Sequence, residues 1–385
     1  MVSIKLGCSR MHYGKDSIKR LAELKGLKKK AFIVMNGTLL KDQGMLDIVT
    51  ENLEEAGIEW RIFTEVEEEP SFNCILKARP EMESFGPDLI VGFGGGSAMD
   101  AAKAMWVYYE NPEYRDLADV MPPNVIRNLR VRAELVCIPT SAGTGSEATR
   151  AAIIKNVERT TKYSVRDMNG RLVPDMAILD PVFTRTLPKA LTASTGMDAL
   201  THAIESYVAL NSNPYSDAMA MSAFVNGYGS LKKCCEDGND MESREKMLAA
   251  SCMGGIAFSN SGLGLTHSIA HTYGAVFNVP HGLANAIVLP YVISYNLKSE
   301  AARGRYEDLA RFIGEADLLE SIIALRKDIG IPESFSAILK DEDAVKNRMD
   351  LMIDKAMTDV CTQYNPVRPD TDDIKMLLLK AYYGN

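Results

Sequence analysis

The chain has 385 residues, which is too long for one small core and predicts two domains. Hydrophobic residues make up 46% of it and charged residues 24%, as in an ordinary globular protein. Its formal net charge of −8 argues against a nucleic-acid-binding surface, because phosphate binding requires a basic patch.

The sequence also indicates in which cellular compartment the protein is expected. Its first residues contain no apolar core of a signal peptide, and no run of about eighteen apolar residues occurs that would span a membrane. The seven cysteines are scattered and form no C-x-x-C pair, which is typical of free thiols in a reducing compartment. We therefore expect a cytoplasmic protein with neither nucleic acid nor membrane as a partner.

Short apolar runs alternate with helical patterns in the first half of the chain. Buried strands are predicted at 31–35, 59–63, 88–93, 134–139 and 176–180. Helices are predicted at 44–57, 97–110 and 72–86, the last with a break or kink near Pro80. The polar stretch 110–130 is predicted to be a loop with a short helix. This alternation predicts a mostly parallel sheet with helices on both faces.

The pattern changes after about residue 187. Strand-like runs nearly vanish, and long helices with apolar periodicity follow one another to the end of the chain. The stretch "RTLPKAL" at 185–191 lies at the change. We therefore predict an α/β domain over 1–187 and an all-helical domain over 188–385.

A glycine cluster suggests a phosphate-binding loop. In "DLIVGFGGGSAMDAAK", Gly94–Gly96 lie between a predicted strand and a predicted helix. Glycines let a backbone approach a pyrophosphate closely, and a helix N-terminus offers free N–H groups. The spacing is not G-x-G-x-x-G, and the alternative is a plain helix cap with Ser97 as the N-cap and Asp100 three residues on.

A second loop strengthens the interpretation. "IPTSAGTGSEAT" at 138–149 also follows a predicted strand, and it combines glycines with hydroxyl side chains. The hydroxyls belong to Thr140, Ser141, Thr144 and Ser146. Two such loops at strand ends favour a dinucleotide lying across the sheet edge, whereas the alternative is two ordinary turns.

Histidines cluster in the second half. Asp198 and His202 lie one helical turn apart, and His267 and His271 repeat that spacing. His281 follows in "VPHG". Imidazole and carboxylate together suit Zn(II) or Fe(II), although a single such pair is more often a surface pair. Spacing alone does not say which four of the five bind a metal.

The motifs together resemble the iron-containing (group III) alcohol dehydrogenase family. They are "GGGSAMDAAK", "PTSAGTGSE", "GMDALTHAIESY", "GIAFSNSGLGLTHSIAH" and "PHGLANAIVLP". The similarity covers nearly the whole chain and is greatest to the alcohol dehydrogenase half of bifunctional aldehyde–alcohol dehydrogenases. The resemblance implies a Rossmann-like nucleotide-binding domain followed by a helical metal-binding domain, the fold shared with dehydroquinate synthase.

The resemblance also implies roles for individual residues. The family's metal ligands fall on Asp198, His202, His267 and His281. His271 matches a catalytic-site histidine beside the nicotinamide, either as a proton shuttle or as a wall that orients the ring. Expected cofactor-binding residues are Asn36, Gly95, Gly96, Ser97, Asp100, Thr140, Ser141, Thr144, Ser146, Lys162 and Leu179. Residues expected near the substrate are Thr149, Arg150, Ala151 and Phe258.

Three positions depart from the family pattern. Glu69 stands where relatives often carry an asparagine near the adenosine, so that contact is not expected to be the same here. Asn36 stands where many relatives have an aspartate that disfavours a 2′-phosphate, so NADP(H) is an alternative to the expected NAD(H). Arg150 stands where bulkier or apolar residues are usual. It would pair with an acidic group on the substrate, or else turn to solvent or to a carboxylate of the protein.

The implied activity is hydride transfer between a short-chain primary alcohol and a nicotinamide. A divalent metal would act as the Lewis acid, with Fe(II) expected and Zn(II) as the alternative. Other substrates left open are acid-bearing aldehydes, glycerol and diols. The alternative of a different class is a metal-dependent lyase similar to dehydroquinate synthase. The family also implies a homodimer or a larger homo-oligomer.

Overall fold

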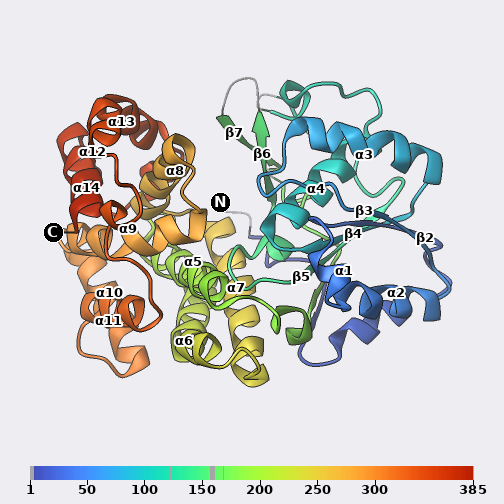
Figure 1. Cartoon of the computed structure of the whole chain (residues 1–385), viewed down its shortest axis with the longest axis horizontal. Helices are drawn as coiled ribbons and strands as arrows, with labels where there is room; N and C mark the ends of the chain where they lie inside the picture. Colours follow the sequence, from blue (N-terminus) through green and yellow to red (C-terminus); the bar gives the residue numbers. More distant parts are fainter. Residues whose placement is uncertain (1–3, 122–123, 157–160, 168, 385) are drawn as a thin grey trace. The chain divides into compact units, whose positions relative to one another are not determined.

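The computed structural model describes residues 4–121, 124–156, 161–167 and 169–384. The chain forms two compact units (Figure 1). One unit comprises Lys5–Ser141 and Gly145–Leu187, and the other contains Pro188–Asn385 together with Ala142–Thr144. Among the described residues, no helix combines the length and apolarity needed to cross a membrane.

The first unit is built on a six-stranded parallel sheet with the order β1-β8-β5-β4-β2-β3. Its strands are β1 (Arg10–Tyr13), β2 (Lys30–Val34), β3 (Glu59–Phe63), β4 (Leu89–Gly94), β5 (Glu134–Pro139) and β8 (Met176–Leu179). The predicted parallel sheet is confirmed. β1 was not predicted, because its four residues alternate between half-buried and exposed and include no apolar run.

Helices cover both faces of this sheet, α3 and α4 on one face and α1 and α2 on the other (Figure 1). They are α1 (Leu39–Asp42), α2 (Met45–Glu55), α3 (Phe72–Phe85) and α4 (Gly96–Glu110). Because successive strand residues point to opposite faces, Phe32 and Ile90 join the core under α3 and α4. Their neighbours Ile33 and Val91 join the core on the α2 side.

Three local features of the first unit can be compared with the sequence predictions. α3 runs through Pro80, so of the predicted break or kink the break is wrong. Within the predicted loop over 110–130, Leu117–Val120 forms a short 3-10 helix, as expected. An antiparallel hairpin, β6 (Ala151–Asn156) with β7 (Thr161–Arg166), was not predicted.

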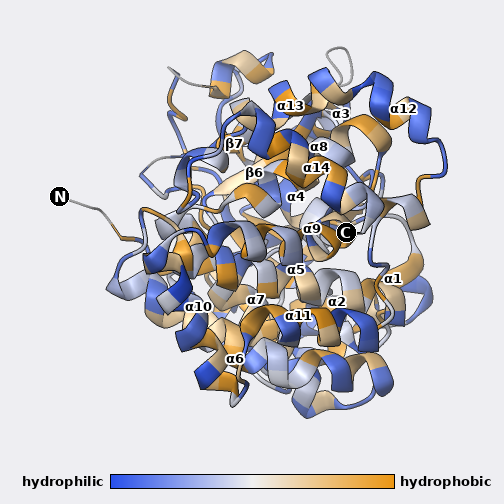
Figure 2. Ribbon diagram, turned by 90° about the vertical axis from the view of Figure 1, so that its left-hand side faces the viewer, coloured by the Kyte–Doolittle hydropathy of each residue, from blue (hydrophilic) through white to orange (hydrophobic). Residues whose placement is uncertain are grey.

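The second unit is helical, as predicted. Its helices are α5 (Lys189–Val208), α6 (Pro214–Glu236), α7 (Met241–Ser261), α8 (Leu265–Phe277), α9 (His281–Asn296), α10 (Glu300–Ile313), α11 (Leu318–Asp328), α12 (Glu342–Asn347), α13 (Met349–Thr358) and α14 (Thr371–Tyr383). α5 is buried over most of its length and packs against α6, α7 and α9. α12 is mainly hydrophilic, as Figure 2 shows, which is expected of a short outer helix.

Candidate metal and cofactor site

α5 places a carboxylate and an imidazole side by side. Asp198 and His202 are four residues apart, so both side chains leave the same face of the helix. Both are buried, and His202 Nε2 lies 3.8 Å from Asp198 Oδ1. The pair therefore faces the interior of the helical unit.

α8 and α9 bring two more imidazoles to the same carboxylate. His267 Nε2 lies 3.8 Å and His281 Nε2 lies 3.5 Å from Asp198 Oδ1. His281 opens α9, and Gly282 follows it. A Cβ on Gly282 would lie 2.5 Å from the Ser194 carbonyl oxygen, so this position must be glycine for α9 to approach α5 so closely.

The four groups fit a divalent metal ion. One ligand atom from each of Asp198, His202, His267 and His281 lies within 4.8 Å of all the others. One carboxylate and three imidazoles form a donor set suited to Fe(II) or Zn(II). The structure thus brings together the four residues that the family resemblance selected.

Hydrogen bonds fix which nitrogen of each ring faces the cluster. The Nδ1 of His267 donates to Glu205 Oε2 at 2.6 Å, and the Nδ1 of His202 donates to the Gly143 carbonyl at 3.1 Å. In both rings Nε2 is consequently the nitrogen with the lone pair. Partners of this kind hold a metal-binding imidazole in the required tautomer and orientation.

Glu205 was missed by the sequence analysis. Besides His267, it accepts hydrogen bonds from the backbone N–H groups of Gly264 and Thr266, at 2.9 and 2.6 Å, where α8 begins. Burial raises the pKa of its carboxyl, and the N–H donors oppose that rise. A signal was present, because Glu205 lies one turn after His202 on the same helix.

The pKa shifts of Asp198 and His267 favour the binding of a cation. Burial and the neighbouring imidazoles lower the pKa of His267 well below its ordinary value, so this ring is neutral at pH 7. Burial acts to raise the pKa of Asp198, but the three histidines outweigh it and the pKa falls. An ionised Asp198 carboxylate and a neutral His267 ring are the forms in which these two groups bind a divalent ion.

His271 lies beside this cluster with a partner of its own. Its Nδ1 donates to Asp359 Oδ2 at 2.9 Å, and its ring stacks on that of His281 with the centroids 5.2 Å apart. The side chain is more exposed than those of His202 and His267. Asp359 was also missed, and its distance of 88 residues from His271 left no spacing signal.

The glycine loop lies where β4 meets α4. Gly95 is the N-cap and α4 begins at Gly96, so the alternative that Ser97 caps the helix is wrong. The Ser97 hydroxyl donates instead to the Glu68 carbonyl. Gly94 has a φ of 151°, and a Cβ there would lie 2.7 Å from Ala98 Cβ. The turn into α4 thus requires glycine, as a close backbone approach to phosphate would.

Two predicted cofactor residues, Asp100 and Ser146, bind each other. Ser146 Oγ donates to Asp100 Oδ1 at 2.6 Å, and the Ile153 N–H donates to Asp100 Oδ2 at 2.8 Å. Lys103, buried and missed by the sequence analysis, donates from Nζ to Ser146 Oγ at 3.0 Å and to Thr149 Oγ1 at 2.9 Å. These side chains tie the second loop to α4.

The other residues predicted for the cofactor are more dispersed. The Thr140 N–H donates to the Gly94 carbonyl at 3.0 Å, and a Cβ on Gly95 would lie 3.4 Å from Ser141 Oγ, so the two loops are adjacent. Thr144 belongs with the helical unit.

Three further cofactor positions lie away from the loops. The side chain of Asn36 donates to the Val66 carbonyl at 2.8 Å, and the Leu179 carbonyl accepts from the Gly14 N–H at 3.1 Å. Lys162 pairs with Lys155 in the hairpin, but its side chain lies outside the described part of the chain.

The residues predicted for the substrate fall in both units. Phe258 of α7 packs on His202, with ring centroids 4.6 Å apart. Thr149, Arg150 and Ala151 belong to the α/β unit, where the carbonyls of Thr149 and Ala151 accept from Lys103 and that of Arg150 accepts from the Asp167 N–H. The predicted pairing of Arg150 with an acidic substrate stays a prediction.

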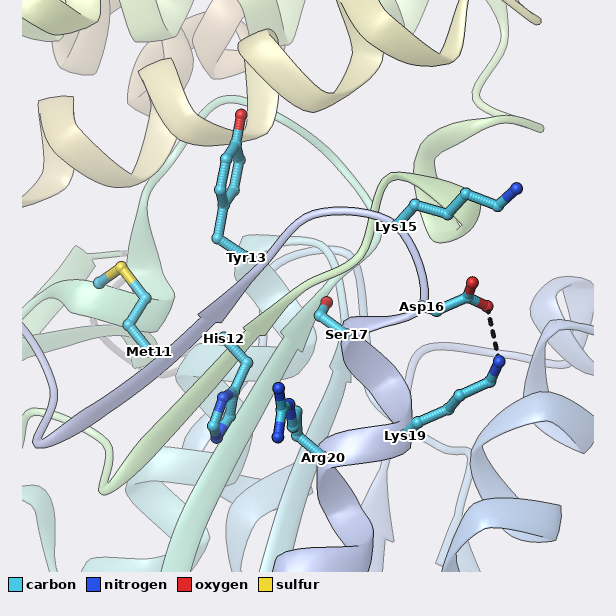
Figure 3. Close-up of a pocket in the computed structure, with 8 residues that line it drawn as sticks. All are labelled: Met11, His12, Tyr13, Lys15, Asp16, Ser17, Lys19 and Arg20. Atoms are coloured by element: carbon cyan, nitrogen blue, oxygen red, sulfur yellow. Dashed lines mark ion pairs between the residues drawn. The ribbon is translucent and has the colours of Figure 1, made fainter.

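A pocket of about 620 Å³ lies beside β1 and the 3-10 helix Ser17–Leu24 (Figure 3). Its lining residues are Met11, His12, Tyr13, Lys15, Asp16, Ser17, Lys19 and Arg20. Lys19 Nζ is paired with Asp16 Oδ1 at 3.2 Å, and Arg20 with Glu23 at 3.4 Å. None of its lining residues belongs to the predicted metal or cofactor sets.

Two family models match the chain. The model described as iron-containing alcohol dehydrogenase matches residues 8–181. The model described as the C-terminal part of the Fe-containing alcohol dehydrogenase family matches residues 192–382.

Named relatives resemble the chain over nearly its whole length. NADPH-dependent butanol dehydrogenase of Clostridium saccharobutylicum is 42% identical over 383 residues, covering 97% of this chain and 96% of that protein. Bifunctional aldehyde-alcohol dehydrogenase AdhE of Escherichia coli K12 is 36% identical over 388 residues, covering 92% of this chain but only 43% of that protein. The chain therefore spans less than half of the bifunctional relative.

Solved structures agree with the fold. An iron-containing alcohol dehydrogenase from Thermococcus thioreducens superposes with a TM-score of 0.92 at 34% identity, covering 100% of both chains. A 1,3-propanediol oxidoreductase superposes with a TM-score of 0.90 at 32% identity, covering 99% of this chain and 100% of that one.

Proposed function

The chain belongs to the iron-containing alcohol dehydrogenase family, and on that premise we propose that it interconverts short-chain primary alcohols and their aldehydes. Hydride would pass to and from a nicotinamide cofactor. The observation that carries the proposal is the buried cluster of one carboxylate and three imidazoles around Asp198 Oδ1. A divalent ion held by such a set supplies Lewis-acid polarisation of the reacting oxygen.

The residues of the chain have distinct proposed roles. Asp198, His202, His267 and His281 hold the metal, with Fe(II) preferred. Glu205 and the Gly143 carbonyl keep two of the imidazoles in the binding tautomer. His271, oriented by Asp359, presents Nε2 to the reacting groups and either moves a proton or orients the nicotinamide.

We assign cofactor binding to the α/β domain over 1–187 and metal binding to the helical domain over 188–385. The loops at Gly94–Gly96 and Thr140–Ser146 support this assignment, because backbone N–H groups at a helix N-terminus favour phosphate. Asn36 carries no charge to repel a 2′-phosphate, and the butanol dehydrogenase relative is NADPH-dependent. The enzyme should therefore accept NADPH as well as NADH. We also propose that it acts in the cytoplasm as a homo-oligomer.

A reductase assay on protein purified without oxygen tests the activity. Short aldehydes, a hydroxyaldehyde and an acid-bearing aldehyde are each offered with NADH and with NADPH, after loading with Fe(II) or Zn(II). We expect turnover of the short aldehydes that depends on the metal. No oxidation of either cofactor with either metal would refute the dehydrogenase proposal.

Metal analysis tests the ligand assignment directly. Asp198→Ala and His267→Ala should each purify with little bound metal, because each removes one of four donors. His12→Ala is the matched control, since His12 lines the separate pocket and should keep wild-type metal content. Wild-type metal content in both ligand variants would show that the assigned set is not the site.

A further inference from the structure

One asparagine touches three of the four proposed ligand atoms. Asn285 lies one turn after His281 on α9 and is fully buried. Its Nδ2 is 2.7 Å from Asp198 Oδ1, 3.1 Å from His281 Nε2 and 3.2 Å from His267 Nε2. A single amide thus spans the space between a carboxylate and two imidazoles.

The orientation of this amide is dictated by its partners. The carboxylate of Asp198 is an acceptor, and His267 Nε2 is one too because the Nδ1 of that ring donates to Glu205. The NH₂ group must therefore point at the cluster. Among the residues that the structure describes, Oδ1 of Asn285 is left buried without a hydrogen-bond partner. Buried polar atoms are normally paired, and here the amide presents its donors to the cluster while Oδ1 has no partner among the described residues.

The numbers of donors and acceptors do not balance. An amide NH₂ has two hydrogens, and three polar atoms of the cluster lie within its reach, of which Asp198 Oδ1 and His267 Nε2 are acceptors. A cation bound by the imidazoles would take up the lone pairs of His267 and His281. The contact with Asp198 would persist, because a carboxylate oxygen has more than one lone pair.

We propose that Asn285 is a positioning residue of the metal centre, holding Asp198, His267 and His281 together before the ion binds and orienting Asp198 afterwards. The proposal rests on the metal set proposed above. Asn285 itself is not a ligand, since it presents N–H groups to the cluster. Its place on α9, on the same face as His281, lets one helix supply both a ligand and its support.

Cobalt binding measures this role apart from catalysis. Co(II) is titrated into the metal-free wild-type protein and into Asn285→Leu, which keeps the side-chain volume but removes both donors. We expect the dissociation constant to rise roughly 10- to 100-fold, the usual effect of losing a group that orients ligands. We also expect the visible absorption band of bound cobalt to shift, because the ligand geometry is no longer held.

Asn111→Leu is the matched control. Asn111 is equally buried, in the α/β unit, and its amide donates to the Val107 and Asn128 carbonyls at 2.8 and 2.9 Å. Its loss should destabilise the protein but leave the cobalt affinity and band unchanged. If Asn285 had only a structural role, Asn285→Leu would likewise destabilise the protein and leave the cobalt affinity and band unchanged.

The outcomes separate this proposal from the proposed function. Wild-type protein that binds no cobalt contradicts the metal set itself, and the positioning role falls with it. A wild-type dissociation constant and band in Asn285→Leu overturn the positioning role alone. Should the leucine variant not fold, Asn285→Ser takes its place. Its shorter hydroxyl side chain cannot span the three acceptors, so unchanged cobalt binding there would equally refute the role.

Discussion

At the scale of single residues, Asp359 decides how the His271 ring is held. Burial acts to raise the pKa of this carboxyl, but hydrogen bonds from His271 and from the Cys361 backbone lower the pKa below its usual range. Asp359 is therefore ionised at neutral pH, accepts the Nδ1 proton of His271 as a hydrogen bond and leaves Nε2 as the nitrogen available to a substrate.

Replacing Asp359 tests whether that orientation matters. Asp359→Ala removes the acceptor and should lower kcat roughly 10- to 100-fold, the usual effect of losing a partner that orients an active-site imidazole. Asp359→Asn keeps an acceptor oxygen and should lose much less. Steady-state kinetics, with metal content checked in each variant, measure the difference. Equal kcat values in Asp359→Ala and wild type would show that His271 needs no such support.

Residues of the site were predictable only where spacing or family motifs reported them. The i, i+4 pairs indicated Asp198, His202 and His267 as candidates, and the structure gathers them with His281. The supporting groups lacked such a signal. Asp359 contacts His271 only because the tertiary fold brings them together. Asn285 lies in a mostly apolar helical segment, where nothing in the sequence distinguishes it as a partner of the metal ligands.

At the scale of an element, α4 is fastened to the second loop by a buried charge. Lys103 Nζ carries three N–H hydrogens and lies within 3.0 Å of four acceptor atoms, which belong to Ser146, Thr149 and Ala151. Burial acts to lower the pKa of Lys103 and to raise that of Asp100, while the attraction between the two opposes both changes. α4 and the loop therefore hold their relative position through hydrogen bonds, because Lys103 and Asp100 both lie on α4 and both contact Ser146.

Lys103→Met should leave Asp100 as a buried charge without its cation. The free energy of unfolding should fall by roughly 3–5 kcal/mol, the usual cost of breaking a buried pair from one side. Affinity for NADH should fall as well, because Ser146 loses one of its anchors. Adding Asp100→Asn should recover part of the stability, since the uncompensated charge is then gone. Denaturant unfolding measures the free energy of unfolding of the single and double variants. If the effects of Lys103→Met and Asp100→Asn simply added, the two charges would not be coupled.

Some strands and helices could be predicted from the sequence and others could not. β2, β4 and β5 were predictable because strands buried on both faces are apolar throughout. β1 was not, because an edge strand with alternating exposure lacks that run. The β6–β7 hairpin was missed because the apolar run of β6 is only four residues long before the charged Lys155 ends it. Pro80 misled because it lies in the interior of α3, where proline usually ends a helix.

At the scale of the whole molecule, all four proposed metal ligands belong to the helical unit and none to the α/β unit. Removing the metal with a chelator should therefore loosen α5, α8 and α9. The loss is about 2.7 kcal/mol for an ion present at one hundred times its dissociation constant. Hydrogen exchange followed by mass spectrometry should show faster exchange in these helices and little change in β2 and β4. Equal acceleration in both units would contradict a metal site confined to the helical one.

The short segment Ala142–Thr144 limits how the chain can be divided. It belongs with the helices although Ser141 and Gly145 on either side belong with the sheet. From this segment the Gly143 carbonyl accepts the Nδ1 hydrogen of His202. A gene cut after codon 187 would therefore encode two fragments, and the one that carries the histidines would lack the carbonyl that orients one of them. A chimera that joins residues 1–187 of one relative to residues 188–385 of another would therefore separate this tripeptide from its own helices. A working chimera must take Ala142–Thr144 from the same protein as the helical unit.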